Sequence, residues 1–211
     1  MKLRYHHFHL PIKLLIIILI PLAIILGVTS YLLYDESTYQ QEFRKVGTYD
    51  RVPNADQVLN SILDFFQGKD KPENLTAAET SHLYDVRSVI NFFTIFFYII
   101  IITKLTLFGL LIFHANKPAE DLIHITSGAG ILTLVITLSL ALVNFDQLFT
   151  AFHNLLFPEG SWLFSESSML IKLFPKEFFI HFSRHIAKNT LFASGFMLTF
   201  SLILWLVTRK E

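Results

Sequence analysis

The sequence predicts an all-α membrane protein with four transmembrane helices and two extracytoplasmic loops that contain amphipathic or re-entrant helices. Hydrophobic residues make up 53% of the 211 residues, and aromatic residues make up 15%. A helix of about 20 residues crosses the hydrocarbon core of a bilayer. Three charge-free runs are at least that long: 21 residues between Lys13 and Asp35, 24 between Asp121 and Asp146, and 20 between Lys188 and Arg209.

A fourth apolar run, 88–113, is interrupted only by Lys104 near its C-terminal end. There the side chain can extend to the lipid headgroups, whereas a lysine at the bilayer centre costs about 2.5–3.5 kcal/mol. The first run is too long for a cleaved signal peptide and has no small-residue cleavage pattern, so we expect it to remain as an anchor. We expect a single membrane domain over 1–211, with spans at approximately 12–34, 88–113, 122–145 and 189–208.

Four spans place both termini on one side of the membrane, and the distribution of Lys and Arg indicates which side. The short segments 1–13, 114–121 and 209–211 hold 6 such residues in 24, against 10 in the 96 residues of the loops 35–87 and 146–188. Because cytoplasmic segments are enriched in Lys and Arg, we expect cytoplasmic termini and outward-facing loops. The first loop has 10 acidic and 6 basic residues, so no nucleic-acid partner is expected.

Two helices are predicted in the first loop. One begins after Asn54 and ends before Gly68, with apolar residues at helical spacing at Val58, Leu59, Ile62, Leu63 and Phe66. Its apolar face suits either the membrane interface or packing against the second loop, and a structural role is favoured. Thr76 and Glu79 have the spacing of a capping box, which predicts a helix leading into the second span. Glu79, His82 and Asp85 then lie on nearly one face.

The second loop is unusually apolar for a segment beside water. Its first part predicts an amphipathic helix with His153 at the edge of the apolar face, which consists of Phe145, Leu148, Phe149, Phe152 and Leu156. Pro158 and Gly160 end this helix. The rest, which includes Trp162, has no clear period, and we expect re-entrant or interfacial segments there. In the third span, the small residues SGAG at 127–130 indicate close helix packing.

The candidates for chemistry are His82 with Glu79, Asp85 and Arg87 in the first loop, and His153 with Asp146 in the second. Histidine can transfer protons in both directions near neutral pH. The chain has no cysteine, which excludes disulfides, thiolate metal sites and a cysteine nucleophile. It also has no G-x-S-x-G, HExxH or glycine-rich phosphate motif. A zinc site built from both histidines and nearby carboxylates remains an alternative.

Four segments resemble the bacterial lipoprotein intramolecular transacylase family. They are HLYDVR at 82–87, FDQLFTAFHNLLF at 145–157, WLF at 162–164 and LIKLFPKEFF at 170–179. The second segment is long and unusual, which makes it the most specific, and the resemblance extends over nearly the whole chain. Where many members of that family have an acidic residue after WLF, this chain has Ser165 and then Glu166, so we assign no role to that position.

The resemblance implies an acyltransferase of the Gram-positive cytoplasmic membrane with its active site on the extracytoplasmic side. The implied partners are membrane lipid and a lipoprotein whose N-terminal cysteine carries a diacylglyceryl group and a free α-amine. The enzyme moves the sn-2 acyl chain onto that amine, which leaves a lyso-form lipoprotein. The implied catalytic residues are His82 and His153. We expect no cofactor and no metal, and we expect supporting or substrate-binding roles for Asp85, Arg87, Asp146 and Trp162.

Transfer from an ester to an amide needs a base, a donor to the oxyanion and an acid for the leaving alkoxide. Our hypothesis assigns the base to His153, and the acid or oxyanion donor to His82, oriented by Asp85. The reverse assignment and an acyl-histidine intermediate are alternatives. Two other functions remain open at this point: a non-enzymatic membrane scaffold and a metal-dependent membrane hydrolase.

Overall fold

The computed structural model describes residues 2–115 and 117–209, with side chains described from residue 9. Contacts within the chain gather into two compact units. Unit 1 comprises Met1–Thr29, Ile95–Leu142 and Ile186–Glu211, and unit 2 comprises Ser30–Thr94 and Val143–His185. The described residues contain helices and turns but no strand, as the predicted fold class requires. The limits of the four spans and the single membrane domain stay predictions.

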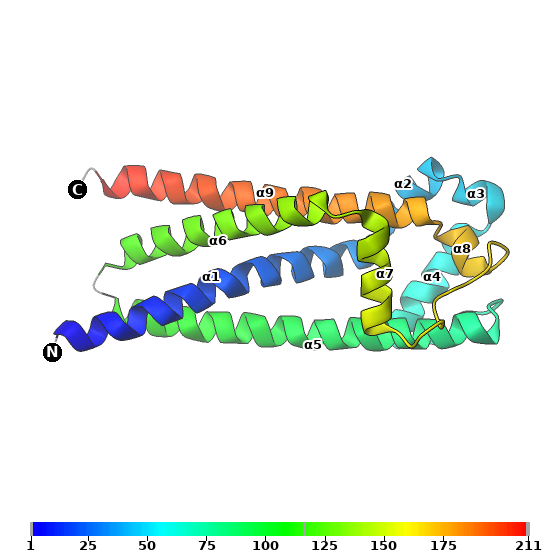
Figure 1. Cartoon of the computed structure of the whole chain (residues 1–211), viewed down its shortest axis with the longest axis horizontal. Coiled ribbons are helices and arrows are strands. Elements are labelled where there is room, and N and C mark those ends of the chain that lie inside the picture. The colour runs from blue at the N-terminus through cyan, green and yellow to red at the C-terminus, as the bar shows by residue number, and fades with distance from the viewer. Residues whose placement is uncertain (1, 116, 210–211) are drawn as a thin grey trace. The chain divides into compact units, whose positions relative to one another are not determined.

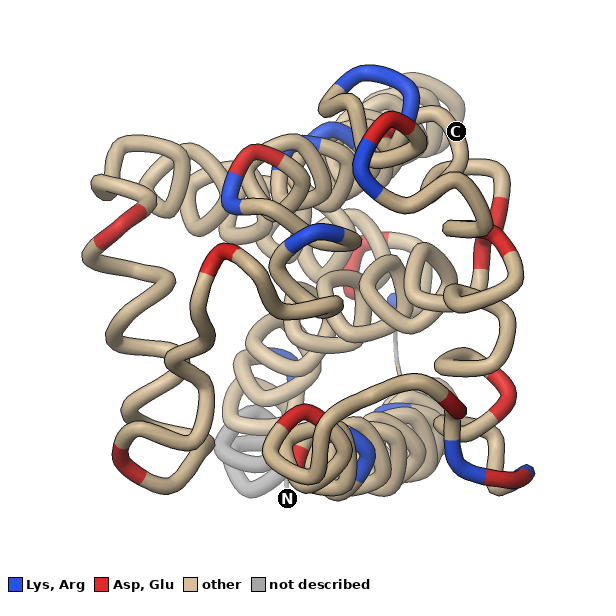
Figure 2. The backbone as a smooth tube through the Cα atoms, turned by 90° about the vertical axis from the view of Figure 1, so that its right-hand side faces the viewer, with Lys and Arg blue, Asp and Glu red and all other residues tan. Residues whose placement is uncertain are grey.

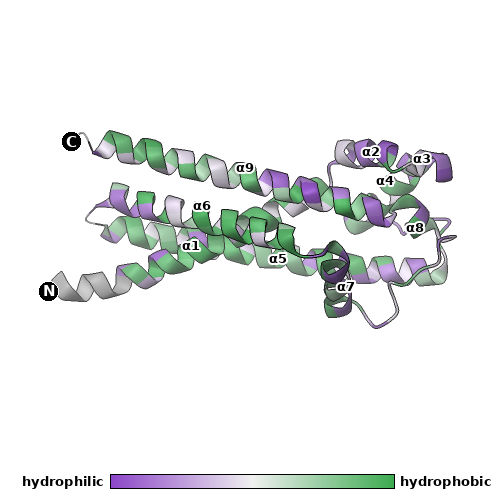
Figure 3. Ribbon diagram, turned by 45° about the horizontal axis from the view of Figure 1, so that its top comes forward, coloured by the Kyte–Doolittle hydropathy of each residue, from purple (hydrophilic) through white to green (hydrophobic). Residues whose placement is uncertain are grey.

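Unit 1 is made from the four long apolar helices (Figure 1). These are α1 (Lys2–Leu33), α5 (Ala77–His114), α6 (Pro118–Leu142) and α9 (Lys176–Thr208). Each is long and apolar enough to cross a membrane. Hydrophobic residues dominate these helices in Figure 3, whereas the short helix α2 (Glu36–Lys45) is mostly polar. The protein is therefore a multi-pass membrane protein, because a helix satisfies its own backbone hydrogen bonds in lipid.

Small residues allow α6 and α9 to approach closely within unit 1. A Cβ atom at Gly130 would lie 2.9 Å from the Leu198 side chain, so the backbone position requires glycine or a shift of Leu198. At the same point the Ser194 hydroxyl donates a hydrogen bond of 2.8 Å to the Gly130 carbonyl oxygen. The close packing expected from SGAG is confirmed at this glycine.

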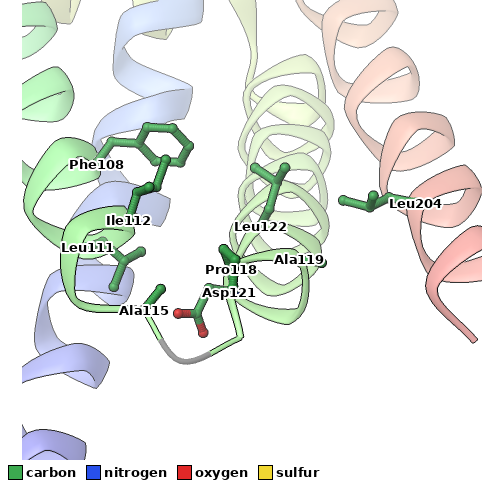
Figure 4. A pocket seen from close by; sticks show the side chains of 9 residues that line it. All are labelled: Phe108, Leu111, Ile112, Ala115, Pro118, Ala119, Asp121, Leu122 and Leu204. Atoms are coloured by element: carbon green, nitrogen blue, oxygen red, sulfur yellow. The ribbon is translucent and has the colours of Figure 1, made fainter. Parts of the chain in front are cut away.

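The first turn of α6 lies beside the ends of α5 and α9. An apolar cavity of about 190 Å³ is lined there by side chains that include Phe108, Leu122 and Leu204, with Asp121 at its edge (Figure 4). Asp121 forms an ion pair with Lys13 of α1. The predicted cytoplasmic end of the first span, the turn between the second and third spans, and the end of the fourth span therefore meet in unit 1.

Unit 2 has a conventional hydrophobic core. It is formed by α2, by α4 (Ala55–Phe66), by α8 (Met169–Leu173) and by the first turns of α5 and α9. Phe43, Leu59, Phe65 and Leu173 are each at most 1% exposed. The predicted helix after Asn54 is confirmed as α4, and its apolar face packs in this core together with residues of the second loop. The sequence did not predict α2 or α3 (Thr48–Arg51).

Helices α5 and α9 both begin earlier than the spans predicted from the sequence. The capping box of Thr76 and Glu79 predicted a helix that leads into the second span, and α5 starts at Ala77 as expected, whereas the start of α9 at Lys176 was not predicted. Their first turns are amphipathic, and Leu83 and Phe178 are buried in the core of unit 2. Charge-free length marks only the membrane-crossing part of a helix, so by itself it does not indicate the turns of α9 before residue 189.

A buried carboxylate joins α2 to α9 in unit 2. Glu42 is fully buried, and its two oxygens accept hydrogen bonds from His181 Nδ1 (2.7 Å) and His185 Nε2 (2.9 Å). Lys45 Nζ lies 2.6 Å from Oε1. Burial alone would raise the pKa of Glu42, but the three hydrogen bonds outweigh burial and lower the pKa to about 2. Glu42 is therefore ionised at neutral pH.

Charges of both signs are distributed over the molecule. Figure 2 marks the backbone positions of Lys and Arg and of Asp and Glu among the described residues.

Replacing Glu42 with Ala should lower the free energy of unfolding by about 1–3 kcal/mol at neutral pH, because it removes a buried acceptor whose three donors remain partly exposed. The pKa is lowered in the folded state, so this stabilisation is present above the ordinary carboxyl pKa and is lost as pH falls through about 2. Unfolding in detergent, followed by circular dichroism, measures both effects. Exposed Glu36→Ala in the same helix is the control, and equal stability of the two variants would contradict the prediction.

Candidate active site

Helix α7 (Phe145–Leu156) is the amphipathic helix expected in the second loop. The Asn144 side chain caps it by accepting hydrogen bonds from the backbone N–H groups of Asp146 (2.9 Å) and Gln147 (3.3 Å). Asp146 also pairs with Lys176 Nζ at 2.5 Å, which ties this end of α7 to the start of α9. Within unit 2, α7 runs across the first parts of α9 and α5 (Figure 1).

The predicted capping box at the start of α5 is confirmed, and it makes one contact that the sequence did not indicate. The backbone N–H and the hydroxyl of Thr76 both donate to Glu79 Oε2 at 2.8 Å, and the Glu79 N–H donates to Thr76 Oγ1 at 3.2 Å. Glu79 Oε1 accepts a further hydrogen bond of 3.0 Å from the Leu170 N–H in α8. Glu79 is 2% exposed. His82 follows one turn later, on a helix end that is fixed to the second loop.

The two candidate histidines meet in a cluster of aromatic rings in unit 2. The ring of Phe157, directly after α7, lies 4.9 Å from the ring of His82 and 5.4 Å from that of His153, measured between centroids. Phe164 lies 5.5 Å from His82, and Trp162 lies 4.7 Å from His153. Both loops therefore contribute to one site, as the sequence-based hypothesis required.

The protonation of His153 follows from its hydrogen bond. Its Nδ1 lies 2.8 Å from the carbonyl oxygen of Phe149, one helical turn earlier. A carbonyl oxygen only accepts, so Nδ1 carries the proton, and in the neutral ring the lone pair is on Nε2. Burial lowers the pKa of His153 below its ordinary value, although the bond to Phe149 favours the charged ring. A neutral, half-buried imidazole with a free Nε2 is a suitable general base.

A sequence profile of the family described as lipoprotein intramolecular transacylase Lit matches residues 12–179. The chain belongs to this family. It is therefore an acyltransferase, and it acts as a lipoprotein intramolecular transacylase. Within the described residues, no observation favours the scaffold or the metal-dependent hydrolase.

Solved structures of one family member have the same fold. The membrane-integral lipoprotein intramolecular transacylase Lit from Bacillus cereus matches with a TM-score of 0.85 and 20% identity, over 98% of this chain and 100% of that chain. A variant of that protein with one histidine replaced by alanine matches with a TM-score of 0.81 and 19% identity, over 100% of both chains. The comparison with curated proteins gave no match.

The other four predicted residues have different surroundings. Trp162 lies in the aromatic cluster, next to His153. The Arg87 guanidinium lies 4.9 Å from the centre of the Phe65 ring, and Asp146 pairs with Lys176. In the described contacts no hydrogen bond joins Asp85 to His82, so the expected orientation of His82 by Asp85 is limited to electrostatic attraction across a longer distance.

The sequence did not single out the aromatic rings that bring the histidines together, Phe157 and Phe164. It also left His181 and His185 without a partner, although their spacing of four residues places them on one helix face and indicates a shared contact. Among the described residues, no group of three or more His, Cys, Asp or Glu side chains is arranged to hold a metal ion.

His153 should titrate below pH 6.5, because its aromatic surroundings disfavour the charged ring. Nuclear magnetic resonance of the protein with ¹⁵N-labelled histidine measures this midpoint, and His153→Gln assigns the signal. Phe157→Ala should move the midpoint upward, toward 6.5, by admitting water beside the ring. Phe196→Ala, at a side chain that is 73% exposed on α9, is the control. A midpoint above 6.5 in the unaltered protein would contradict the lowered pKa.

Proposed function

We propose that His153 is the general base of the intramolecular transfer and that His82 is the acid for the leaving alkoxide. The observation that carries this assignment is the hydrogen bond from His153 Nδ1 to the Phe149 carbonyl oxygen, which leaves Nε2 as the proton acceptor. His82 has no such bond, and its Nδ1 is buried without a partner among the described residues. This difference favours the assignment over the reverse one.

The proposed substrate is a lipoprotein with a diacylglyceryl-cysteine at its N-terminus. His153 Nε2 takes a proton from the α-amine, whose nitrogen forms a bond to the carbonyl carbon of the sn-2 ester. The tetrahedral oxyanion then collapses, and the bond between that carbon and the glycerol oxygen breaks. His153 passes the proton of the amine, directly or through solvent, to the neutral ring of His82, and His82 in turn gives a proton to the glycerol oxygen as that bond breaks. The products are an N-acyl amide and a free glycerol hydroxyl, so atoms and protons balance.

This reaction needs no external acyl donor, because the ester and the amine belong to one molecule. Holding them in attack geometry supplies an effective concentration of about 10⁵ M or more, which accounts for much of the rate. Phe157, Phe164 and Phe149 surround the two imidazoles with apolar surface. Such surroundings keep water away from the ester, which favours transfer to the amine over hydrolysis.

We also propose that both termini are cytoplasmic and that the site is on the extracytoplasmic side. The excess of Lys and Arg in segments 1–13, 114–121 and 209–211 supports this orientation. The ion pair between Lys13 and Asp121 is consistent with it, because it joins two of these segments at one end of unit 1. The lipoprotein substrate and surrounding lipid would then reach the site from the outer leaflet.

His82→Ala and His153→Ala should each reduce transacylation by at least about 10³-fold, since each removes a proton-transfer group. The assay uses the purified protein in detergent with a synthetic diacylglyceryl-cysteine lipopeptide, and mass spectrometry locates the acyl chain. His114→Ala is the control, because this histidine is exposed at the end of α5, in unit 1. Full activity of either histidine variant would remove that residue from the mechanism.

The orientation can be tested with single cysteines, because the chain has none of its own. Ser167→Cys, at an exposed position of the second loop, should react with a membrane-impermeant maleimide in intact cells. Lys117→Cys, between α5 and α6, should react only after the membrane is permeabilised. The opposite pattern would overturn the proposed orientation.

A further inference from the structure

Two buried polar atoms in the aromatic cluster have no hydrogen-bond partner in the described part of the chain. They are Trp162 Nε1 and His82 Nδ1. Buried tryptophan N–H groups usually donate to a partner, because burying an unpaired donor is unfavourable. Each of these two atoms comes from a different loop, and their rings are linked by contacts that run from His82 to Phe157, then to His153 and then to Trp162. The orphaned indole therefore marks a place where an acceptor from outside the chain is needed.

The chemistry of indole restricts what that acceptor can be. The N–H group donates and cannot accept, and it does not titrate at any pH at which the protein is folded. Among the reacting groups of a diacylglyceryl-cysteine, the amine uses its lone pair for attack. The carbonyl oxygen of the sn-2 ester keeps its lone pairs throughout, and it becomes negatively charged when the amine adds. A preorganised donor at that oxygen stabilises the transition state.

The position of Trp162 beside His153 agrees with this role. A hydrogen bond of about 2.9 Å from His153 Nε2 to the amine, followed by C–N and C–O bonds of about 1.5 and 1.3 Å, places the oxyanion roughly 5 Å from Nε2. The indole ring is centred 4.7 Å from the His153 ring and is tilted by 42° to it. The Trp162 N–H therefore belongs to a ring that contacts His153, the proposed base.

We propose that Trp162 is a catalytic residue whose Nε1–H donates a hydrogen bond to the oxyanion formed from the sn-2 ester carbonyl. This proposal rests on the acyl transfer described above, and it completes the division of tasks. His153 takes the proton of the amine, Trp162 stabilises the oxyanion, and His82 protonates the glycerol oxygen. Because indole does not give up its proton, the intermediate stays an anion and collapses by expelling the glycerol oxygen.

The test separates the N–H group from the shape of the ring. The chain has two tryptophans, so in a Trp205→Phe background Trp162 is the only one, and growth with β-(3-benzothienyl)alanine replaces its N–H by sulfur in a ring of nearly the same shape. Trp205 is 41% exposed on α9 and contacts Arg209, so Trp205→Phe alone is the matched control. Trp162→Phe is the second variant, and each protein is assayed with the synthetic lipopeptide.

Removing the N–H should lower kcat by about 100-fold and leave KM nearly unchanged, because the oxyanion exists only after attack. The pH dependence of kcat should keep its midpoints, since indole does not titrate. Trp205→Phe should retain full activity. If the benzothienyl protein keeps kcat within twofold, or if only KM changes, Trp162 is not the oxyanion donor. A loss seen in Trp162→Phe but not in the benzothienyl protein would likewise assign the effect to ring packing and overturn the proposal.

Failure of this proposal is distinguishable from failure of the histidine assignment. If His82→Ala and His153→Ala abolish transfer while the benzothienyl protein is fully active, only the role of Trp162 is lost. If either histidine variant is fully active, the assignment of proton transfer is lost, whatever the indole does. Full activity of Trp205→Phe shows that the background substitution does not cause a loss seen in the benzothienyl protein.

Discussion

The carboxylate of Glu79 is the contact on which the geometry of the site depends. One of its oxygens completes the capping box of α5, and the other accepts the N–H of Leu170, 91 positions away in the second loop. The bond from Leu170 is buried and the capping box is partly buried, so together they leave little freedom for either segment. The helix that carries His82 is thereby fixed to the loop that carries His153. Other hydrogen bonds between the two loops, such as those from His181 and His185 to Glu42, lie on α2 and α9 and not on the helix that carries His82.

The rings around the two histidines are mostly aromatic, and this affects the protonation of the imidazoles. Phenylalanine rings contact both imidazoles, and they disfavour a charged ring. A neutral histidine is the form that can accept a proton, so these apolar surroundings favour the protonation state that the proposed base requires. The cost is that polar atoms such as Trp162 Nε1 lose their contact with water. The substrate is the natural source of the missing acceptor.

Units 1 and 2 are stabilised by different kinds of packing, because the hydrophobic effect drives burial from water but does not act between helices that lie in lipid. In unit 2 the core is closed by the hydrophobic effect, with Phe43 and Leu173 fully buried around the ionic contacts of Glu42. In unit 1, lipid is as apolar as the side chains, so close approach at Gly130 and the hydrogen bond from Ser194 contribute more. The Bacillus cereus protein has the same fold at 20% identity, so different side chains are compatible with this arrangement of helices.

The sequence by itself determined the features that depend on neighbouring residues. Three charge-free runs and a fourth apolar run interrupted only by Lys104 identified the four apolar helices. Helical spacing identified α4 and α7, and the pair of Thr76 and Glu79 identified the start of α5. The resemblance then indicated His82 and His153. Only the tertiary structure decided which distant groups meet: Glu42 with His181 and His185, Glu79 with Leu170, and both site histidines with Phe157. Local patterns report burial and period, but they do not specify a partner many positions away, because that choice depends on how all the helices pack.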